Sequence, residues 1–331
     1  MKHTLESQNV ATTNKLLQIE QDVANTNANI VYLGKNLQND ISEINVRTRD
    51  MQNLLVHISN IQSEICSQKA SFPINCDDET RYQEFIELTS ARICQTLYQA
   101  GSACVDHEEA LLKGMFGAYW DTLDPFSRKA LVSARVFLAN CSSASYGGLD
   151  YSGVCISACS ALENELKLRF FTGYKSYLLE RFKTDYVKWP KSMIYDNRAP
   201  SERFTIGSMP AIFGSMQRDE KTGRRSFKPK MSITPEEKKL LDEYIRTILY
   251  DKNQDSRVFY AHDEYGLSFL DRCEDVRCIY RNTAAHTEAI SFETATECCR
   301  DIIGIDSISA ATKVGQIQGL IYDLAKWTKV P

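Results

Sequence analysis

The sequence predicts an all-α protein, and three observations support that class. Residues 5–70 contain no proline and a single glycine, and apolar residues recur among them at a strict spacing of seven. Residues 154–182 carry apolar side chains over a wide helical arc, which is typical of a central core helix. The period-two alternation of a half-buried strand nowhere lasts more than a few residues.

The spacing of seven predicts one long helix near the amino terminus, which we interpret as a coiled-coil arm over residues 1–72. The stripe consists of Leu16, Val23, Ile30, Leu37, Ile44, Met51, Ile58 and Ile65. Its companion row is poorer, because Thr26, Asp40 and Arg47 interrupt it. The stripe favours association with a second copy or with a partner protein through residues 5–70. The alternative is a helix that folds back and packs on the body.

Residues 73–145 are predicted to be a helical connecting segment. We expect helices from Asp77 or Asp78 through Tyr98, from Asp106 or His107 through Thr122, and from Asp124-Pro125 to about Asn140. Aspartate suits the N-cap of the first helix, and Pro125 suits the first turn of the third. A loop with Gly147-Gly148 follows.

Residues 146–331 are predicted to form the main helical domain. After the helix over 154–182, a shorter helix begins at Ser201 or Ser208 and ends near Gln217. Thr234-Pro235-Glu236-Glu237 predicts a capped helix start, and that helix should end near Tyr250. Three more helices are expected over about 264–280, 292–303 and 310–328.

Composition bounds the function without specifying it. The chain has 331 residues, 43% of them hydrophobic and 25% charged, with a net charge of −4 that argues against a generally basic coat for nucleic acid. No apolar run approaches the roughly 18 residues that span a bilayer, so no membrane partner is expected. The amino terminus lacks the apolar core of a signal peptide, which predicts a cytoplasmic protein with eleven reduced cysteines. Cysteine spacing matches no metal site, and no cofactor is expected.

The segment Arg281-Asn282-Thr283-Ala284-Ala285-His286 carries the most suggestive chemistry. The Arg281 guanidinium has a planar set of donors that fits phosphate oxygens, and His286 can transfer protons near neutral pH. On an ideal helix Arg281 and His286 lie about 140° apart, so a shared phosphate requires either an interrupted helix or a second copy. The alternative is that Arg281 pairs with Glu288 or Asp275 and that His286 closes a helix start.

Several segments resemble the HEPN superfamily, which comprises all-helical domains of prokaryotic ribonucleases and toxins. Arg281 to His286 matches its R-x4-6-H motif, including the polar Asn282 after the arginine. Residues 149–167, with Ala161-Leu162-Glu163, resemble the family's long first helix. Residues 204–213 resemble its short "TLG" helix, and residues 120–134 resemble the helical segment that often precedes the first helix. The resemblance covers roughly residues 110–328 and implies a HEPN-like helical bundle.

The resemblance implies a metal-independent endoribonuclease of the defence or toxin type, with two copies forming one composite site as a homodimer or larger assembly. Arg281, Asn282 and His286 would be catalytic: His286 moves the proton, Arg281 stabilises the phosphate, and Asn282 orients one of them. Glu163 is a possible supporting acid, with a surface charge as the alternative. A tyrosine often lies two residues after the family's histidine, but Glu288 stands here, which makes control by its modification doubtful.

The sequence also contains a basic segment that could contact RNA. Residues 218–230 form a basic loop, read either as a solvated loop tip or as a contact for the RNA backbone. Its candidate RNA-binding residues are Arg218, Lys221, Arg224, Arg225, Lys228 and Lys230. The alternative to the ribonuclease is a non-catalytic HEPN adaptor that uses its coiled coil to assemble a defence or regulatory complex.

Overall fold

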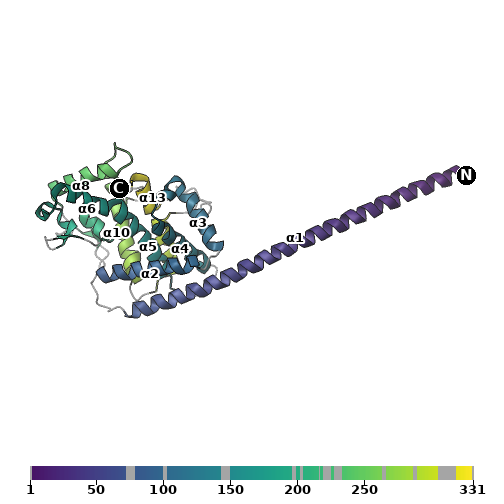
Figure 1. Ribbon diagram of the computed structural model, residues 1–331, viewed down its shortest axis with the longest axis horizontal. Coiled ribbons are helices and arrows are strands. Elements are labelled where there is room, and N and C mark those ends of the chain that lie inside the picture. The colour runs from purple at the N-terminus through teal and green to yellow at the C-terminus, as the bar shows by residue number, and fades with distance from the viewer. Residues whose placement is uncertain are drawn as a thin grey trace. The chain divides into compact units, whose positions relative to one another are not determined.

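The protein is all-α with a long amino-terminal helix, as the sequence predicts, in a computed structural model (Figure 1). The model describes residues 2–71, 79–99, 103–142, 150–195, 199–201, 204–215, 217–218, 225–226, 233–262, 266–285, 289–304 and 318–329. The chain divides into two compact units, Met1–Asn53 and Leu54–Pro331. None of the helices in these ranges combines the length and apolar content needed to cross a bilayer.

Helix α1 covers Lys2–Ser71 without a break, and its heptad stripe has two environments. In the first unit Leu16, Val23, Ile30, Leu37 and Ile44 are 54–61% exposed. In the second unit the stripe residues Ile58 and Ile65 are buried, together with Leu54 and Ile61. Complete burial of such a side chain contributes about 1.5–3 kcal/mol. The last turns of α1 therefore belong to the body.

The two expected domain boundaries differ from the division into compact units. The sequence placed the end of the arm at residue 72, whereas the second unit begins at Leu54. The expected segments 73–145 and 146–331 lie together within that unit. The physical reason for the earlier boundary is that the side chains of α1 become buried from Leu54 onward.

The helices before the core helix follow the expected order. They are α2 (Glu79–Gln99), α3 (Ala103–Phe116), the 3-10 helix η1 (Gly117–Thr122) and α4 (Pro125–Ser142). Asp124 accepts a hydrogen bond from the backbone N–H of Phe126 at 2.8 Å, which stabilises the start of α4. Helix α3 begins before the expected Asp106, and the predicted caps at Asp77 and Asp78 lie outside the described residues.

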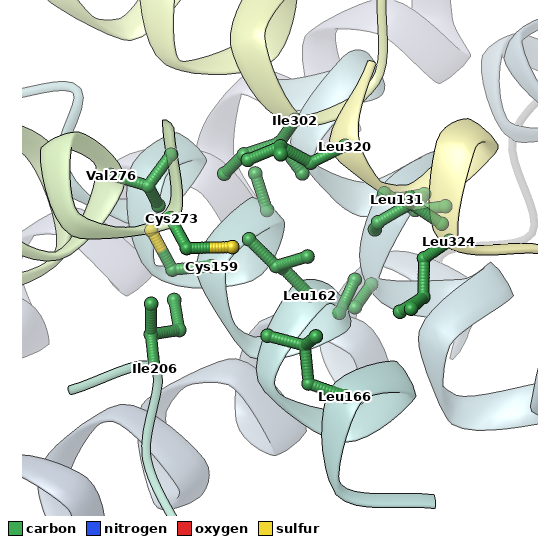
Figure 2. Close-up of a cluster of buried hydrophobic side chains, with 14 of the residues drawn as sticks. Leu131, Cys159, Leu162, Leu166, Ile206, Cys273, Val276, Ile302, Leu320 and Leu324 are labelled. Carbon is green, nitrogen blue, oxygen red and sulfur yellow. The ribbon is translucent and has the colours of Figure 1, made fainter. Parts of the chain in front are cut away.

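The predicted core helix forms three consecutive segments: α5 (Ser152–Leu166), the π-helical turn η2 (Lys167–Phe171) and α6 (Thr172–Phe182). Helix α5 contacts α2, α4, α11, α12 and α13, so it is the centre of the body. Figure 2 shows Leu162 and Leu166 of α5 among Leu131 of α4 and Leu324 of α13, with Ile302 of α12 nearby. All five side chains are buried.

The middle of the chain contains short elements. These are the 3-10 helices η3 (Tyr186–Lys188) and η4 (Lys191–Met193), the strands β1 (Ile194–Tyr195) and β2 (Ala199–Pro200), and helix α7 (Ser208–Phe213). Strand β1 pairs antiparallel with β2, with Ile194 opposite Pro200. Of the two expected starts for the short helix, Ser208 is the observed one. Gly214 ends it in the left-handed conformation at φ 62°.

The next two strands lie within the expected basic loop. Strands β3 (Gln217–Arg218) and β4 (Arg225–Ser226) pair antiparallel, with Arg218 opposite Arg225. The candidate RNA contacts Lys221, Arg224, Lys228 and Lys230 lie outside the described residues. The sequence did not predict these two-residue strands, because they are shorter than any recognisable alternation.

The carboxy-terminal helices begin at capped positions. Helix α8 (Pro235–Ile248) starts with the predicted capping box, in which Thr234 and Glu237 bond reciprocally, and α9 (Arg257–Tyr260) follows it. Helix α10 (Phe269–Asp275) begins at the N-cap Ser268, not near residue 264 as expected, because Ser268 and Asp271 form a capping box. The remaining elements are the π-helical turn η6 (Val276–Arg281), α11 (Asn282–Ala285), α12 (Phe292–Ile302) and α13 (Leu320–Trp327). The last helix was expected from about residue 310, and residues 305–317 lie outside the described residues.

Candidate functional site

Arg281 lies at the point where the hydrogen-bonding pattern of its helix changes. It is the last residue of the π-helical turn η6, and α11 continues from Asn282 to Ala285. π-helical turns are uncommon and occur frequently at functional sites. His286 follows the last described residue of α11 and itself lies outside the described residues.

The guanidinium of Arg281 is 0% exposed and contacts three side chains. Its Nη1 donates to Oδ1 of Asn282 at 3.1 Å, and its Nη2 donates to Oε1 of Gln83 at 3.0 Å. Oε1 of Glu163 lies 3.4 Å from its Nε. The carboxylate compensates a charge that is taken out of water, since an uncompensated charge at this depth would be very costly.

Glu163 is buried, so it is not the surface charge that the sequence left as an alternative. It is 4% exposed on α5, and its Oε1 also accepts a hydrogen bond from the backbone N–H of Ile206 at 3.1 Å. One carboxylate oxygen therefore connects the segment before α7 to Arg281. One acidic partner of Arg281 therefore comes from another helix, α5. Of the two acidic partners that the sequence had offered, Glu288 lies outside the described residues.

The segment Thr205-Ile206-Gly207 lies close to the helix that carries Arg281. A Cβ atom added at Gly207 would lie 2.8 Å from Cδ of Arg277, a separation that real Cβ atoms essentially never show. Glycine at this position therefore permits the close approach to η6. Arg277 itself is held by Glu274, with Nε to Oε2 and Nη2 to Oε1 both at 2.9 Å.

Three segments that are far apart in the sequence thus meet at Glu163. They are the Ala161-Leu162-Glu163 region of α5, the segment before α7, and the end of η6. These are also three of the segments on which the resemblance to a known superfamily rests. The resemblance implied that Glu163 could point toward Arg281, but it made no prediction for the position of the segment before α7.

A cavity of about 260 Å³ adjoins this cluster. It is lined by Gln83, Glu87, Phe126, Ser160, Glu163, Asn164, Lys167 and Phe204. Three of the lining residues belong to α5 and Lys167 begins η2; all four repeat at helical spacing, so one face of the core helix forms a wall. Gln83 and Glu163 line the cavity and also contact Arg281. The cavity is therefore a space from which a ligand could approach Arg281.

The chain after the hexapeptide is anchored through Asp150. Oδ1 of Asp150 accepts hydrogen bonds from the backbone N–H of Ile290 at 3.0 Å and of Ser152 at 2.9 Å. Oδ2 accepts from Nζ of Lys69, near the end of α1, at 3.2 Å. Burial would raise the pKa of Asp150, but the hydrogen bonds from Ser152 and Ile290 and the charge of Lys69 together hold it below its ordinary value.

The structure brings together only some of the candidate residues. Arg281, Asn282 and Glu163 form one cluster. Arg218 and Arg225 face each other across the β3–β4 pair, and their side chains are not described. Gln83 was missed by sequence reasoning, because a glutamine in an ordinary helix that is separated from Arg281 by 198 positions gives no local signal. In the described ranges, no three His, Cys, Asp or Glu side chains gather in an arrangement that could hold a metal ion.

Comparisons with known proteins give no match to the chain, whether against family models, curated proteins or solved structures. The functional interpretation therefore depends on the residues of the site and on the motif resemblance.

Proposed function

We propose that the chain is a metal-independent endoribonuclease of the HEPN type, with its site at Arg281, Asn282 and His286. The ribose 2′-hydroxyl attacks the adjacent phosphorus, the bond from phosphorus to the 5′-oxygen breaks, and a 2′,3′-cyclic phosphate remains. The nucleophile loses one proton and the leaving oxygen gains one. His286 acts as the general acid or base in these transfers.

Arg281 supplies the charge stabilisation in this proposal. Negative charge accumulates on the phosphate oxygens at the pentavalent stage, and a guanidinium matches their geometry with paired donors. Asn282 orients that guanidinium, because its Oδ1 accepts a hydrogen bond from Nη1 of Arg281. Glu163 lies 3.4 Å from Nε on another side and compensates the charge of the group.

The observation that carries the proposal is a wholly buried arginine with side-chain partners that border a cavity. Side chains can rearrange at little cost to the fold, so the contacts of Arg281 can be exchanged for a ligand more easily than contacts to the backbone. Two of its partners, Gln83 and Glu163, border the cavity. Lys167 adds a positive charge to the same lining, which suits a phosphate group.

A role in antiviral defence or as a toxin, and a composite site between two copies, form part of the same proposal. Helix α2 packs against α11, which begins directly after Arg281. A second copy that brings its own motif to this place has to meet it beside α2 or displace α2. RNA contacts by the basic residues of 218–230 also belong to this proposal.

Incubation with cellular RNA in EDTA tests the proposed activity. We expect cleavage by the wild type that leaves cyclic phosphate ends, and a loss of about 10²–10³-fold in Arg281→Ala, the typical effect of removing one stabilising donor. His286→Ala should be similarly impaired. The control His107→Ala changes an exposed histidine on α3 and should cleave like the wild type. Equal cleavage by all four proteins would contradict the assignment.

A non-catalytic adaptor is the second candidate, and the exposed stripe of α1 favours it. Five apolar residues at heptad spacing remain more than half exposed in the first unit. A sustained heptad stripe is the pattern by which two identical helices associate, so the occupant we propose is a second copy of α1. The same association would also serve the ribonuclease, because it keeps two copies together.

Lysine substitutions on α1 test this association. Replacement of Val23, Ile30 and Leu37 by lysine should lower the oligomer mass in light scattering, because three charges would enter the apolar contact. The matched control carries lysine at the exposed polar positions Asn25, Asn39 and Ser42 and should keep the wild-type mass. Equal masses for both variants and the wild type would contradict association through this stripe.

A further inference from the structure

The side-chain amide of Gln83 is held at both ends. Its Nε2 donates to Oε1 of Glu87, one turn further along α2, at 2.6 Å. Its Oε1 accepts from Nη2 of Arg281 at 3.0 Å. Gln83 therefore has a fixed orientation in which its carbonyl oxygen points at the guanidinium.

This contact occupies a position that a phosphate oxygen would need. Charge-assisted bonds between guanidinium donors and phosphate oxygens are about 2.7–2.9 Å long. Gln83 borders the cavity, so a phosphate oxygen that approaches Nη2 from the cavity meets the place where the Gln83 oxygen now lies. Arg281 is 0% exposed in this arrangement. The structure is therefore that of a closed site, in which the protein itself occupies one donor of Nη2.

The cavity shows how the site could open without unfolding the body. Gln83 lines the cavity and contacts Arg281, so rotation of this one side chain would connect the cavity to the guanidinium. Gln83 lies near the start of α2, and its partner Glu87 is exposed. Rotation of a part-exposed side chain is a fast and inexpensive motion compared with displacement of a helix.

We propose that Gln83 is an intramolecular latch, which occupies the phosphate position at Arg281 until a phosphate of the RNA replaces it. This inference rests on the proposed ribonuclease function and adds a mode of regulation at the same site. The exchange favours the ligand, because a bond to a charged phosphate is roughly twice as strong as a bond to a neutral amide oxygen. RNA that enters the cavity thus opens the site that cleaves it.

The variant Gln83→Ala tests the latch, with Gln95→Ala as the matched control at an exposed position of the same helix. The first readout is the rate at which phenylglyoxal modifies Arg281, followed by mass spectrometry. Loss of a hydrogen bond to a charged group should raise that rate roughly tenfold or more in Gln83→Ala. Arg169 is also 0% exposed and provides an internal control whose rate should not change. Equal melting temperatures would show that the fold is intact.

The second readout is RNA cleavage in EDTA by the same proteins and by Arg281→Ala. The latch predicts faster cleavage by Gln83→Ala than by the wild type and by Gln95→Ala. An unchanged modification rate at Arg281 overturns the latch. If the wild type cleaves RNA and Arg281→Ala does not, but Gln83→Ala cleaves no faster than the wild type, the latch is overturned and the nuclease proposal stands. A faster modification without cleavage by any protein supports the latch and rejects the nuclease.

Discussion

Two arginines are completely buried in the part of the chain that the structure describes, and their known partners differ. Arg169 and Arg281 each lie in a π-helical turn and each contact a glutamate of α5, Glu165 or Glu163. The guanidinium of Arg169 also donates to two backbone carbonyls, of Thr122 at 2.6 Å and of Thr328 at 2.9 Å. The described partners of Arg281 are side chains.

The difference separates a structural arginine from a candidate functional one. Backbone carbonyls move only when whole segments move, so Arg169 ties the chain before α4 and the carboxy-terminal segment to the core helix. Side-chain partners can rotate, and two of those around Arg281 border a cavity. Burial and an ion pair are common to both residues, so neither property alone indicates function.

The largest effect is expected from Arg169→Ala, which should lower the free energy of unfolding by about 3–5 kcal/mol because Glu165 remains buried without its partner. Denaturant unfolding would measure the change. The exposed variant Arg92→Ala, which removes a surface pair to Glu64, is the control and should cost less than about 1 kcal/mol. If Arg169→Ala lowered the free energy of unfolding as little as the control does, Arg169 would not be a structural residue.

Arg281→Ala should cost less stability, about 2–3 kcal/mol, because the side chains of Gln83 and Asn282 can rotate toward other partners and Glu163 keeps the hydrogen bond from Ile206. The same unfolding experiment measures this change, and cleavage assays in EDTA should show the larger effect on activity. If Arg281→Ala were as destabilising as Arg169→Ala, the two residues would be alike in their contribution to the fold.

Asp150 resembles Arg169 in being bonded to the backbone, since it accepts hydrogen bonds from the N–H groups of Ser152 and Ile290. Asp150→Asn should therefore lower the free energy of unfolding by about 2 kcal/mol at neutral pH. The pKa of Asp150 is lower in the folded protein, so its contribution is complete above the ordinary carboxyl pKa of 3.8. It should be lost as the pH falls through the lower folded value. Unfolding of both proteins across this range measures the difference, and a difference that grows toward low pH would contradict the assignment.

The smallest effect on stability is expected from Gly207→Ala, at about 1–2 kcal/mol, because its Cβ would press on Cδ of Arg277. The added atom should shift the segment that holds Glu163, so cleavage should fall more than stability does. The control Gly114→Ala introduces a Cβ into open space. Thermal unfolding and cleavage of both variants would be compared, and equal behaviour would show that the close approach does not matter to the site.

Local signals in the sequence predicted much of the fold. The uninterrupted heptad stripe predicted α1, and Thr234 with Glu237 predicted the start of α8. The start of α10 was misplaced because the cap at Ser268 competes with an apparently continuous helical pattern. The two π-helical turns were not predicted, since a single extra residue per turn leaves no visible change in periodicity.

The candidate site was predictable only in part. The motif and the resemblance indicated Arg281 and Asn282, and Glu163 was a possible supporting residue that the structure places 3.4 Å from Arg281. The role of Gln83 could not be read from the sequence, because its contact with Arg281 arises from the packing of α2 against α5 and α11. Long-range contacts of this kind depend on tertiary packing and not on local pattern.

The most direct test is RNA cleavage in EDTA by Gln83→Ala and by the double variant Gln83→Ala/Arg281→Ala, with analysis of the product ends. Gln83→Ala should cleave and leave 2′,3′-cyclic phosphates, and the double variant should lose this activity by about 10²–10³-fold. Equal cleavage by the two proteins, or cleavage that requires an added metal ion, would contradict a phosphodiester-cleaving site at Arg281.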